Sequence, residues 1–279
     1  MLDILSFIPP PMLWLFSFLL GVIIGSFLNV YIYRLHTGKS LSGSSHCLSC
    51  GTSLKSYELI PLFSYLGLRG KCRTCGSSIP ARYFLVELLT GVLFLVTVLF
   101  FSNLIQVGLV WWVMALLVVV AVYDLYHMII PDRMVLWLLA LAFVWQGYLL
   151  YIETISVSGF GLNFIATTIG SLFLFLLWWL SKGKWIGFGD VKLCWPLGLL
   201  VGYLGVFSML VLSFWIGAIV GITLLAFQKI KISGQPHLRF FKRQLTIKSA
   251  VPFAPFLILG FLAVFFLKVD VVALITYVP

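Results

Sequence analysis

Long apolar stretches separated by short polar segments dominate the pattern along the chain. Each of eight such stretches is predicted to form a membrane-spanning helix. The predicted spans are 12–33, 83–101, 104–123, 134–152, 161–180, 191–204, 206–227 and 251–267. One crossing requires about 20 mainly apolar residues. The stretch 191–227 is too long for a single crossing, and Gly202 and Gly205 mark the expected turn within it. The pattern therefore predicts an all-α polytopic membrane protein.

Composition excludes the usual soluble classes. Hydrophobic residues make up 62% of the chain and charged residues 9%, whereas soluble domains carry about 25% charged residues. The 279 residues are expected to serve one bundle with loops. We predict a first transmembrane helix within 1–33, a polar loop at 34–82 and a transmembrane bundle at 83–279.

The distribution of charge predicts the orientation of the bundle. With eight spans and the N-terminus outside, 17 of the 18 Lys and Arg residues fall on one side, and only Lys268 falls on the other. The positive-inside rule assigns the basic side to the cytosol. The net charge of +10 then reflects topology and attraction to anionic lipid headgroups. Because no nucleic-acid-binding motif accompanies this charge, we expect no nucleic-acid partner.

The polar loop 34–82 contains four of the five cysteines, arranged as two C-x-x-C pairs that are each followed by glycine. They are Cys47, Cys50, Cys72 and Cys75. Two such pairs at this spacing are typical of a structural zinc site with four thiolate ligands. Two disulfides are the alternative, which a reducing cytosol disfavours. Cys194 stands alone in a predicted span and is interpreted as a small buried apolar residue.

Two aspartates lie at the ends of apolar helices. Asp124 ends the run WWVMALLVVVAVY, and Asp190 follows Gly187 and Gly189 in GFGD. Carboxylates beside a membrane core are costly and are therefore functional candidates. We interpret this pair as the catalytic dyad of an intramembrane aspartic protease, in which the two glycines leave room for an extended substrate backbone. The alternatives are an N-cap role for Asp190 and a simple turn for the glycines; capping is also the preferred interpretation of Asp132.

Several sequence blocks occur in order along nearly the whole chain. They are GSFLNVYIYRL at 25–35, the two C-x-x-C pairs, LRGKCRTCG at 68–76, IPARYFLVE at 79–87, an Asp followed by IIPD across 124–132, GFGDVKL at 187–193 and VPFAPFL at 251–257. In these blocks the chain resembles the bacterial type IV prepilin peptidases, which belong to the GxGD aspartic proteases. Ala254 stands where that family usually has Gly, and Tyr126 stands where it often has a second acid. Neither departure is expected to affect the aspartate pair.

The resemblance implies a function. Asp124 and Asp190 would be the catalytic aspartates of an enzyme in the bacterial inner membrane. Its substrate would be a prepilin or pseudopilin whose basic leader is cut on the cytosolic side, after a glycine. The large loop is associated with a second activity, methylation of the new N-terminal residue from S-adenosylmethionine. The sequence carries no independent motif for that cofactor, and Glu58, Arg82 and Glu87 are polar candidates for contact with substrate or cofactor.

Alternatives from other classes remain open at this point. A non-catalytic membrane scaffold would use the zinc loop for partner binding and the acids as helix caps. An ion-coupled transporter would use the acids along an ion pathway, but such proteins often show repeated halves, and no internal repeat is evident here. An archaeal-type preflagellin peptidase, which lacks methylation, is disfavoured by the cysteine loop.

Overall fold

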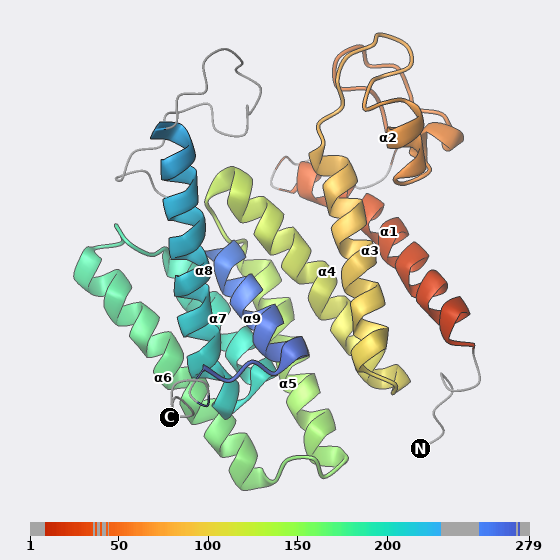
Figure 1. Ribbon diagram of the computed structural model, residues 1–279. Coiled ribbons are helices and arrows are strands. Elements are labelled where there is room, and N and C mark those ends of the chain that lie inside the picture. Colours follow the sequence, from red (N-terminus) through yellow and green to blue (C-terminus); the bar gives the residue numbers. More distant parts are fainter. Residues whose placement is uncertain are drawn as a thin grey trace. The chain divides into compact units, whose positions relative to one another are not determined.

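The computed structural model describes residues 9–35, 37, 40, 43, 45–229, 251–271 and 273. Its elements are α1 (Pro10–Arg34), the 3-10 helix η2 (Ser56–Leu59), α2 (Phe63–Gly67), α3 (Arg82–Phe100), α4 (Leu104–His127), α5 (Asp132–Tyr151), α6 (Val157–Ser181), α7 (Phe188–Val201), α8 (Tyr203–Lys229) and α9 (Ala254–Leu267). Figure 1 labels the α-helices. Within the described residues there is no β-strand, only two isolated bridges in the polar loop. The expectation of an all-α protein is confirmed.

Each predicted span corresponds to a helix, but eight crossings are not confirmed. Among the described residues, six helices are long and apolar enough to cross a membrane: α1, α3, α4, α5, α6 and α8. Helices α7 and α9 have 14 residues each. At about 1.5 Å per residue they are roughly 21 Å long, short of the hydrocarbon thickness of about 30 Å. Helix α7 also begins at Phe188, three residues earlier than expected.

The chain divides into two compact units, Met1–Val122 and Tyr123–Pro279, and α4 passes from the first into the second. The first unit groups α3 with α1 and the polar loop, whereas the sequence had assigned α3 to the peptidase bundle. The predicted division into 1–33, 34–82 and 83–279 stays a prediction.

In the first unit, α1 and α3 approach closely because glycines line their interface. A Cβ atom on Gly21 would lie 2.7 Å from the backbone oxygen of Thr90 and 2.8 Å from the Cα of Gly91. A Cβ atom on Gly25 would lie 2.8 Å from the Cα of Glu87. Small residues permit this close backbone packing between membrane helices. The contact at Gly25 places Glu87 beside α1, next to the polar loop.

In the second unit, a network of buried amides holds the carboxyl end of α7. Gln146 of α5 donates a hydrogen bond from Nε2 to the carbonyl of Leu199. Asn163 of α6 donates from Nδ2 to the side-chain oxygen of Gln146 over 3.1 Å, and its own Oδ1 accepts from the backbone N–H of Tyr203 over 2.8 Å. The turn between α7 and α8 is made by Gly202, whose φ of +78° is readily adopted only by glycine.

The amino end of α7 has its own contact with α6. The hydroxyl of Ser171 donates to the carbonyl of Val191 over 2.9 Å. Further along α7, Gly198 allows close approach, because a Cβ atom there would lie 2.8 Å from Oγ1 of Thr167. Helix α7 is therefore fixed at both ends by polar groups from its neighbours, although it is short.

We predict that Asn163→Leu destabilises the protein by about 1–3 kcal/mol, because it leaves buried donors and acceptors unpaired. The measurement is the thermal unfolding midpoint of the purified protein in detergent. The matched control is Thr168→Val on the same helix, since the hydroxyl of Thr168 bonds only to the carbonyl of Phe164 one turn earlier. Equal losses in the two variants would contradict a special role for the amide network.

Candidate active site and candidate metal centre

Asp124 lies in the last turn of α4, four residues after Val120 and three before the helix ends at His127. Its side chain is buried, with 5% of its surface exposed, and its Oδ2 has no hydrogen-bond partner. The carboxylate also interacts with the backbone of Ala254, at the first residue of α9. The interaction is made by the backbone of Ala254, so the expectation that Ala in place of Gly leaves the aspartate pair unaffected stays a prediction.

His127 does not serve Asp124 as a partner. Its ring packs on that of Tyr123, with 4.4 Å between the ring centroids, and the residue is exposed. The position of Asp124 near the carboxyl end of a helix is unfavourable for an anion. Burial, an unpaired oxygen and this position together mark Asp124 as a residue that is not explained by structural stabilisation.

Asp190 is the third residue of α7, and Gly187 occupies the N-cap position. The suggestion that Asp190 itself is the N-cap is therefore wrong, because the helix begins two residues before it. Its Oδ2 accepts a hydrogen bond from the N–H of Gly187 over 3.2 Å. Its Oδ1 is buried and has no partner. Helix capping thus accounts for only one of the two carboxylate oxygens.

The structure brings Asp124 and Asp190 together within the second unit. The two carboxylates are near enough to interact electrostatically, at the end of the unit where α4 ends and α7 and α9 begin (Figure 1). Each retains one buried oxygen that is not hydrogen-bonded. Buried polar atoms are usually paired, and exceptions call for an explanation. Two such oxygens in one place are suited to bind a water molecule or a substrate group.

The two glycines of GFGD have local structural roles. Gly187 has an ordinary φ of −74°, and a Cβ atom there would lie 3.3 Å from Oδ2 of Asp190. A Cβ atom on Gly189 would lie 3.0 Å from the Cβ of Ile130. Gly189 therefore lets the segment after Asp124 pack against the start of α7. The role of these glycines in substrate binding stays a prediction.

Asp132 does not cap α5, because the N-cap position belongs to Pro131. Its carboxylate instead forms an ion pair with Lys192 of α7, and 70% of its side chain is exposed. An exposed pair of this kind contributes at most about 1 kcal/mol. Asp132 is thus the one acid of this region whose surroundings fully account for it, which makes it a useful comparison for Asp124 and Asp190.

In the first unit, two similar turns carry the cysteine pairs. The N–H of Gly51 donates to the carbonyl of Cys47, and the N–H of Gly76 donates to the carbonyl of Cys72, both over 2.9 Å. The two glycines have φ values of +71° and +69°, which favour glycine over other residues. The sequence spacing therefore folds into two matching knuckles.

The four sulfur atoms of these knuckles lie within 4.8 Å of one another. The distance between the sulfurs of Cys47 and Cys75 is 3.9 Å. A tetrahedron of thiolates around zinc, with bonds of about 2.3 Å, has an edge of about 3.8 Å. All four cysteines are free, and a disulfide would require about 2.05 Å. The cluster could hold a metal ion, and the structure does not support the disulfide alternative.

Hydrogen bonds around the cluster favour thiolates. The backbone N–H of Cys50, then that of Ser49 and then the hydroxyl of Ser77 lower the pKa of Cys47 to about 6. The pKa of Cys75 is lowered chiefly by the hydroxyl of Ser77. Metal binding requires deprotonated thiols, so these contacts prepare the sulfurs of Cys47 and Cys75 as ligands, whereas the pKa of Cys72 is raised.

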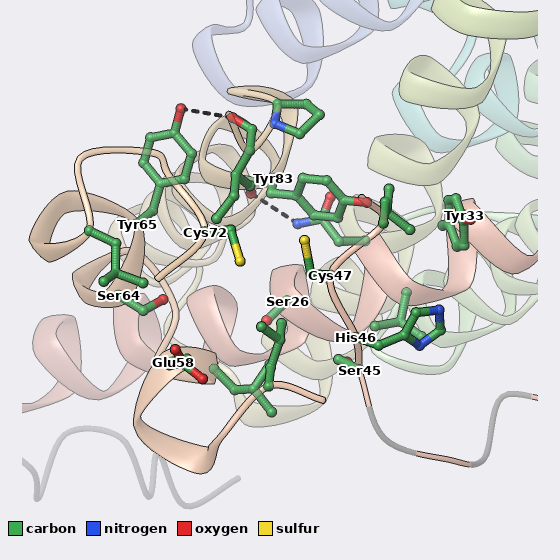
Figure 2. Close-up of a pocket in the computed structure, with 18 of the residues that line it drawn as sticks. Ser26, Tyr33, Ser45, His46, Cys47, Glu58, Ser64, Tyr65, Cys72 and Tyr83 are labelled. Carbon is green, nitrogen blue, oxygen red and sulfur yellow. Dashed lines mark hydrogen bonds between the residues drawn. The ribbon is translucent and has the colours of Figure 1, made fainter. Parts of the chain in front are cut away.

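A cavity of about 500 Å³ lies beside the cysteine cluster, between α1, the polar loop and α3 (Figure 2). Glu58 and Glu87, which sequence analysis singled out, line this cavity, whereas Arg82 is not among its lining residues. Two other polar residues of the lining, Ser26 and Asn29, were missed. They lie within a predicted span, where an isolated small polar residue carries little signal.

Comparison with known proteins identifies the family. The sequence model of the bacterial Peptidase A24 N-terminal domain matches residues 19–101, and that of the type IV leader peptidase family matches residues 111–222. A Prepilin leader peptidase/N-methyltransferase of Stutzerimonas stutzeri is 31% identical over 273 residues, which cover 86% of each chain. The chain belongs to the type IV leader peptidase family.

Two further relatives carry the same name. The protein from Pseudomonas aeruginosa is 32% identical over 280 residues, covering 88% of each chain. That from Myxococcus xanthus is 34% identical over 224 residues, which cover 77% of this chain and 64% of the relative. No solved structure matched the chain. Membership of a peptidase family makes the protein an enzyme, and it does not support the scaffold and transporter alternatives.

We expect the purified protein to contain about one zinc ion per chain, and Cys72→Ser to lose it, because three thiolates leave the coordination sphere open. Cys194→Ala should retain the zinc, since Cys194 is buried in α7 and is not one of the four clustered cysteines. Metal content measured by mass spectrometry checks both variants. Zinc retained at the wild-type level by Cys72→Ser would exclude the four-thiolate site.

Proposed function

We propose that this enzyme cleaves the leader peptide of type IV prepilins or pseudopilins and then methylates the new N-terminal residue. The observation that carries the first part is the pair Asp124 and Asp190, buried together with one unpaired oxygen each. The name of the relatives, Prepilin leader peptidase/N-methyltransferase, supports both parts.

The two aspartates would act as an acid–base pair. Two neighbouring carboxyl groups cannot both ionise cheaply, so the pair holds one shared proton and titrates as a unit. The ionised member takes a proton from a water molecule, which attacks the carbonyl carbon of the scissile peptide bond. The protonated member donates a hydrogen bond to the developing oxyanion and then helps to protonate the leaving amine as the C–N bond breaks.

The substrate must reach the pair as an extended chain, because carbonyls within a helix are already hydrogen-bonded. Gly187 and Gly189 precede Asp190 without side chains that would obstruct such a backbone. At many binding sites, an extended peptide lies alongside exposed backbone of the protein and forms hydrogen bonds with it. We infer that the GFGD segment lies along the substrate, in addition to its packing against Ile130.

The distribution of charge within the second unit supports a cytosolic location for the aspartates. The segments at their end of the unit carry Arg133, Lys182, Lys184 and Lys192, whereas Lys268 follows the carboxyl end of α9. Under the positive-inside rule the basic end faces the cytosol. We infer from this orientation that the N-terminus faces outside and that anionic lipid headgroups surround the basic end.

The second activity is assigned to the first unit. Zinc held by Cys47, Cys50, Cys72 and Cys75 would organise the polar loop without reacting, because four thiolates leave no open coordination position. S-adenosylmethionine supplies an electrophilic methyl group when it is bound. The amine of the new N-terminus would take this methyl group from sulfur and release a proton to water.

We predict that Asp124→Asn and Asp190→Asn each lower leader cleavage by about 10²–10⁴-fold, because Asn keeps the shape but cannot exchange the proton. Cleavage is followed by gel mobility of a coexpressed prepilin. Asp132→Asn is the matched control and should cleave normally, since Asp132 is exposed and pairs with Lys192.

Both catalytic variants should insert into the membrane normally and still methylate a supplied mature pilin. That result would separate the aspartate pair from the methyl-transfer site. An Asp190→Asn variant that cleaves at the wild-type rate would rule out the dyad mechanism.

A further inference from the structure

The cavity of the first unit has one wall that is rich in hydrogen-bond acceptors. Asn29 and Ser26 of α1 and Glu87 of α3 meet there. The opposite side is formed by the polar loop, including Cys47 and Cys72 (Figure 2). All the lining residues belong to the first unit, so the cavity is complete without the peptidase aspartates. Its volume of about 500 Å³ lies within the range of about 300–1,000 Å³ that is usual for small-molecule and cofactor sites.

Asn29, which lines this cavity, has an unused acceptor. Its Nδ2 donates to the backbone carbonyl of Tyr83 over 2.9 Å, which fixes the orientation of the amide. Its Oδ1 is buried and has no hydrogen-bond partner, while only 3% of the residue is exposed. A buried acceptor without a partner is costly. A ligand with an N–H group would satisfy it.

Glu87 adds a carboxyl group to the same wall. It is 8% exposed, its Oε2 accepts a hydrogen bond from the N–H of Leu62 over 2.8 Å, and its carboxylate is also bonded by the hydroxyl of Ser26. No cation is recorded as an ion-pair partner of this carboxylate among the described residues. A buried charge is ordinarily paired, and a cationic ligand would provide the opposite charge.

Aromatic rings complete the cavity. Tyr33, Tyr65, Tyr83 and Phe84 line it, and Tyr65 packs against Phe84 with 5.4 Å between the ring centroids. Tyr65 is held in place by a hydrogen bond from its hydroxyl to the carbonyl of Ile79 over 3.4 Å. Faces of such rings attract cations and can stack with flat heterocycles.

We propose that this cavity binds S-adenosylmethionine, with its primary ammonium group received by Asn29 and Glu87. The chemistry of this ligand matches the lining of the cavity. Its ammonium group needs hydrogen-bond acceptors and negative charge, and its sulfonium is attracted by negative charge and aromatic faces. Its adenine needs a flat apolar surface. The inference rests on the proposed methyl transfer and names the residues that would bind the donor. A peptide with a free N-terminus also carries a primary ammonium, so the test must distinguish these two sources.

The test measures binding of radiolabelled S-adenosylmethionine to the purified full-length protein in detergent, by equilibrium dialysis. We expect Glu87→Gln and Asn29→Leu each to weaken binding by about tenfold or more, because each variant removes a charged or buried hydrogen bond to the ligand. Glu87→Gln is the milder change, because the Gln oxygen can still accept the bond from Leu62. Glu153→Gln is the matched control and should bind as the wild type does, since Glu153 lies outside the cavity in the turn after α5.

Leader cleavage by each variant, followed in parallel, verifies that the protein is folded. If both cavity variants bind S-adenosylmethionine as tightly as the wild type does, the inference is overturned. If the wild type still methylates a mature pilin in that case, the proposed function is unaffected. A wild type that neither binds the donor nor methylates a mature pilin would overturn both. A second titration uses a peptide that begins with the N-terminal residue of a mature pilin. If the variants lose affinity for that peptide alone, the cavity is the amine's site and the inference fails.

Discussion

The position of Asp190 depends on how the short helix α7 is held inside the bundle. A helix of 14 residues cannot cross the bilayer by its own length, so its ends must be satisfied by neighbouring protein rather than by water. The side-chain oxygen of Asn163 accepts a hydrogen bond from the backbone N–H of Tyr203, just beyond the carboxyl end of α7. The hydroxyl of Ser171 donates a hydrogen bond to the carbonyl of Val191, near its amino end. These contacts restrain the position of α7 along the bundle and its rotation about its own axis. The direction in which Asp190 points is restrained with it.

Because α7 is held in this way, the carboxylate of Asp190 is kept near enough to that of Asp124 for the two to interact electrostatically. Gly189 contributes by allowing Ile130 to approach the start of α7. The backbone of Ala254, at the start of α9, interacts with the carboxylate of Asp124. Preorganisation of this kind matters for acid–base chemistry, since a catalytic group must already lie within hydrogen-bond reach of the atom that it serves. It also explains why two acidic oxygens remain unpaired within an otherwise closely packed unit.

Much of this arrangement was predictable from the sequence, and the failures have physical causes. The apolar stretches predicted all the long helices, and the spacing of Cys47, Cys50, Cys72 and Cys75 predicted the thiolate cluster, because both signals are local. Hydropathy predicted a short helix here but placed its start at 191 rather than at Phe188. It could not show that polar groups near the carboxyl end of α7 are satisfied by distant residues such as Gln146 and Asn163. Asp132 was misassigned because its partner, Lys192, is 60 residues away. The contact between Ala254 and Asp124 joins segments even further apart, and Asn29 gains its significance only from a cavity that the sequence does not reveal.

The chemistry of the two proposed activities imposes an order on them. The nucleophile in methyl transfer is the free amine of the mature N-terminus, and that amine does not exist until the leader peptide bond has been broken. Each site is built within one compact unit: the aspartates lie in Tyr123–Pro279, and the cysteine cluster and its cavity lie in Met1–Val122. A defect in the aspartate pair therefore removes the substrate of the second reaction without altering the residues that would perform it. Methylation lost in such a variant should be restored when a mature pilin is supplied, whereas methylation lost through Asn29 or Glu87 should not.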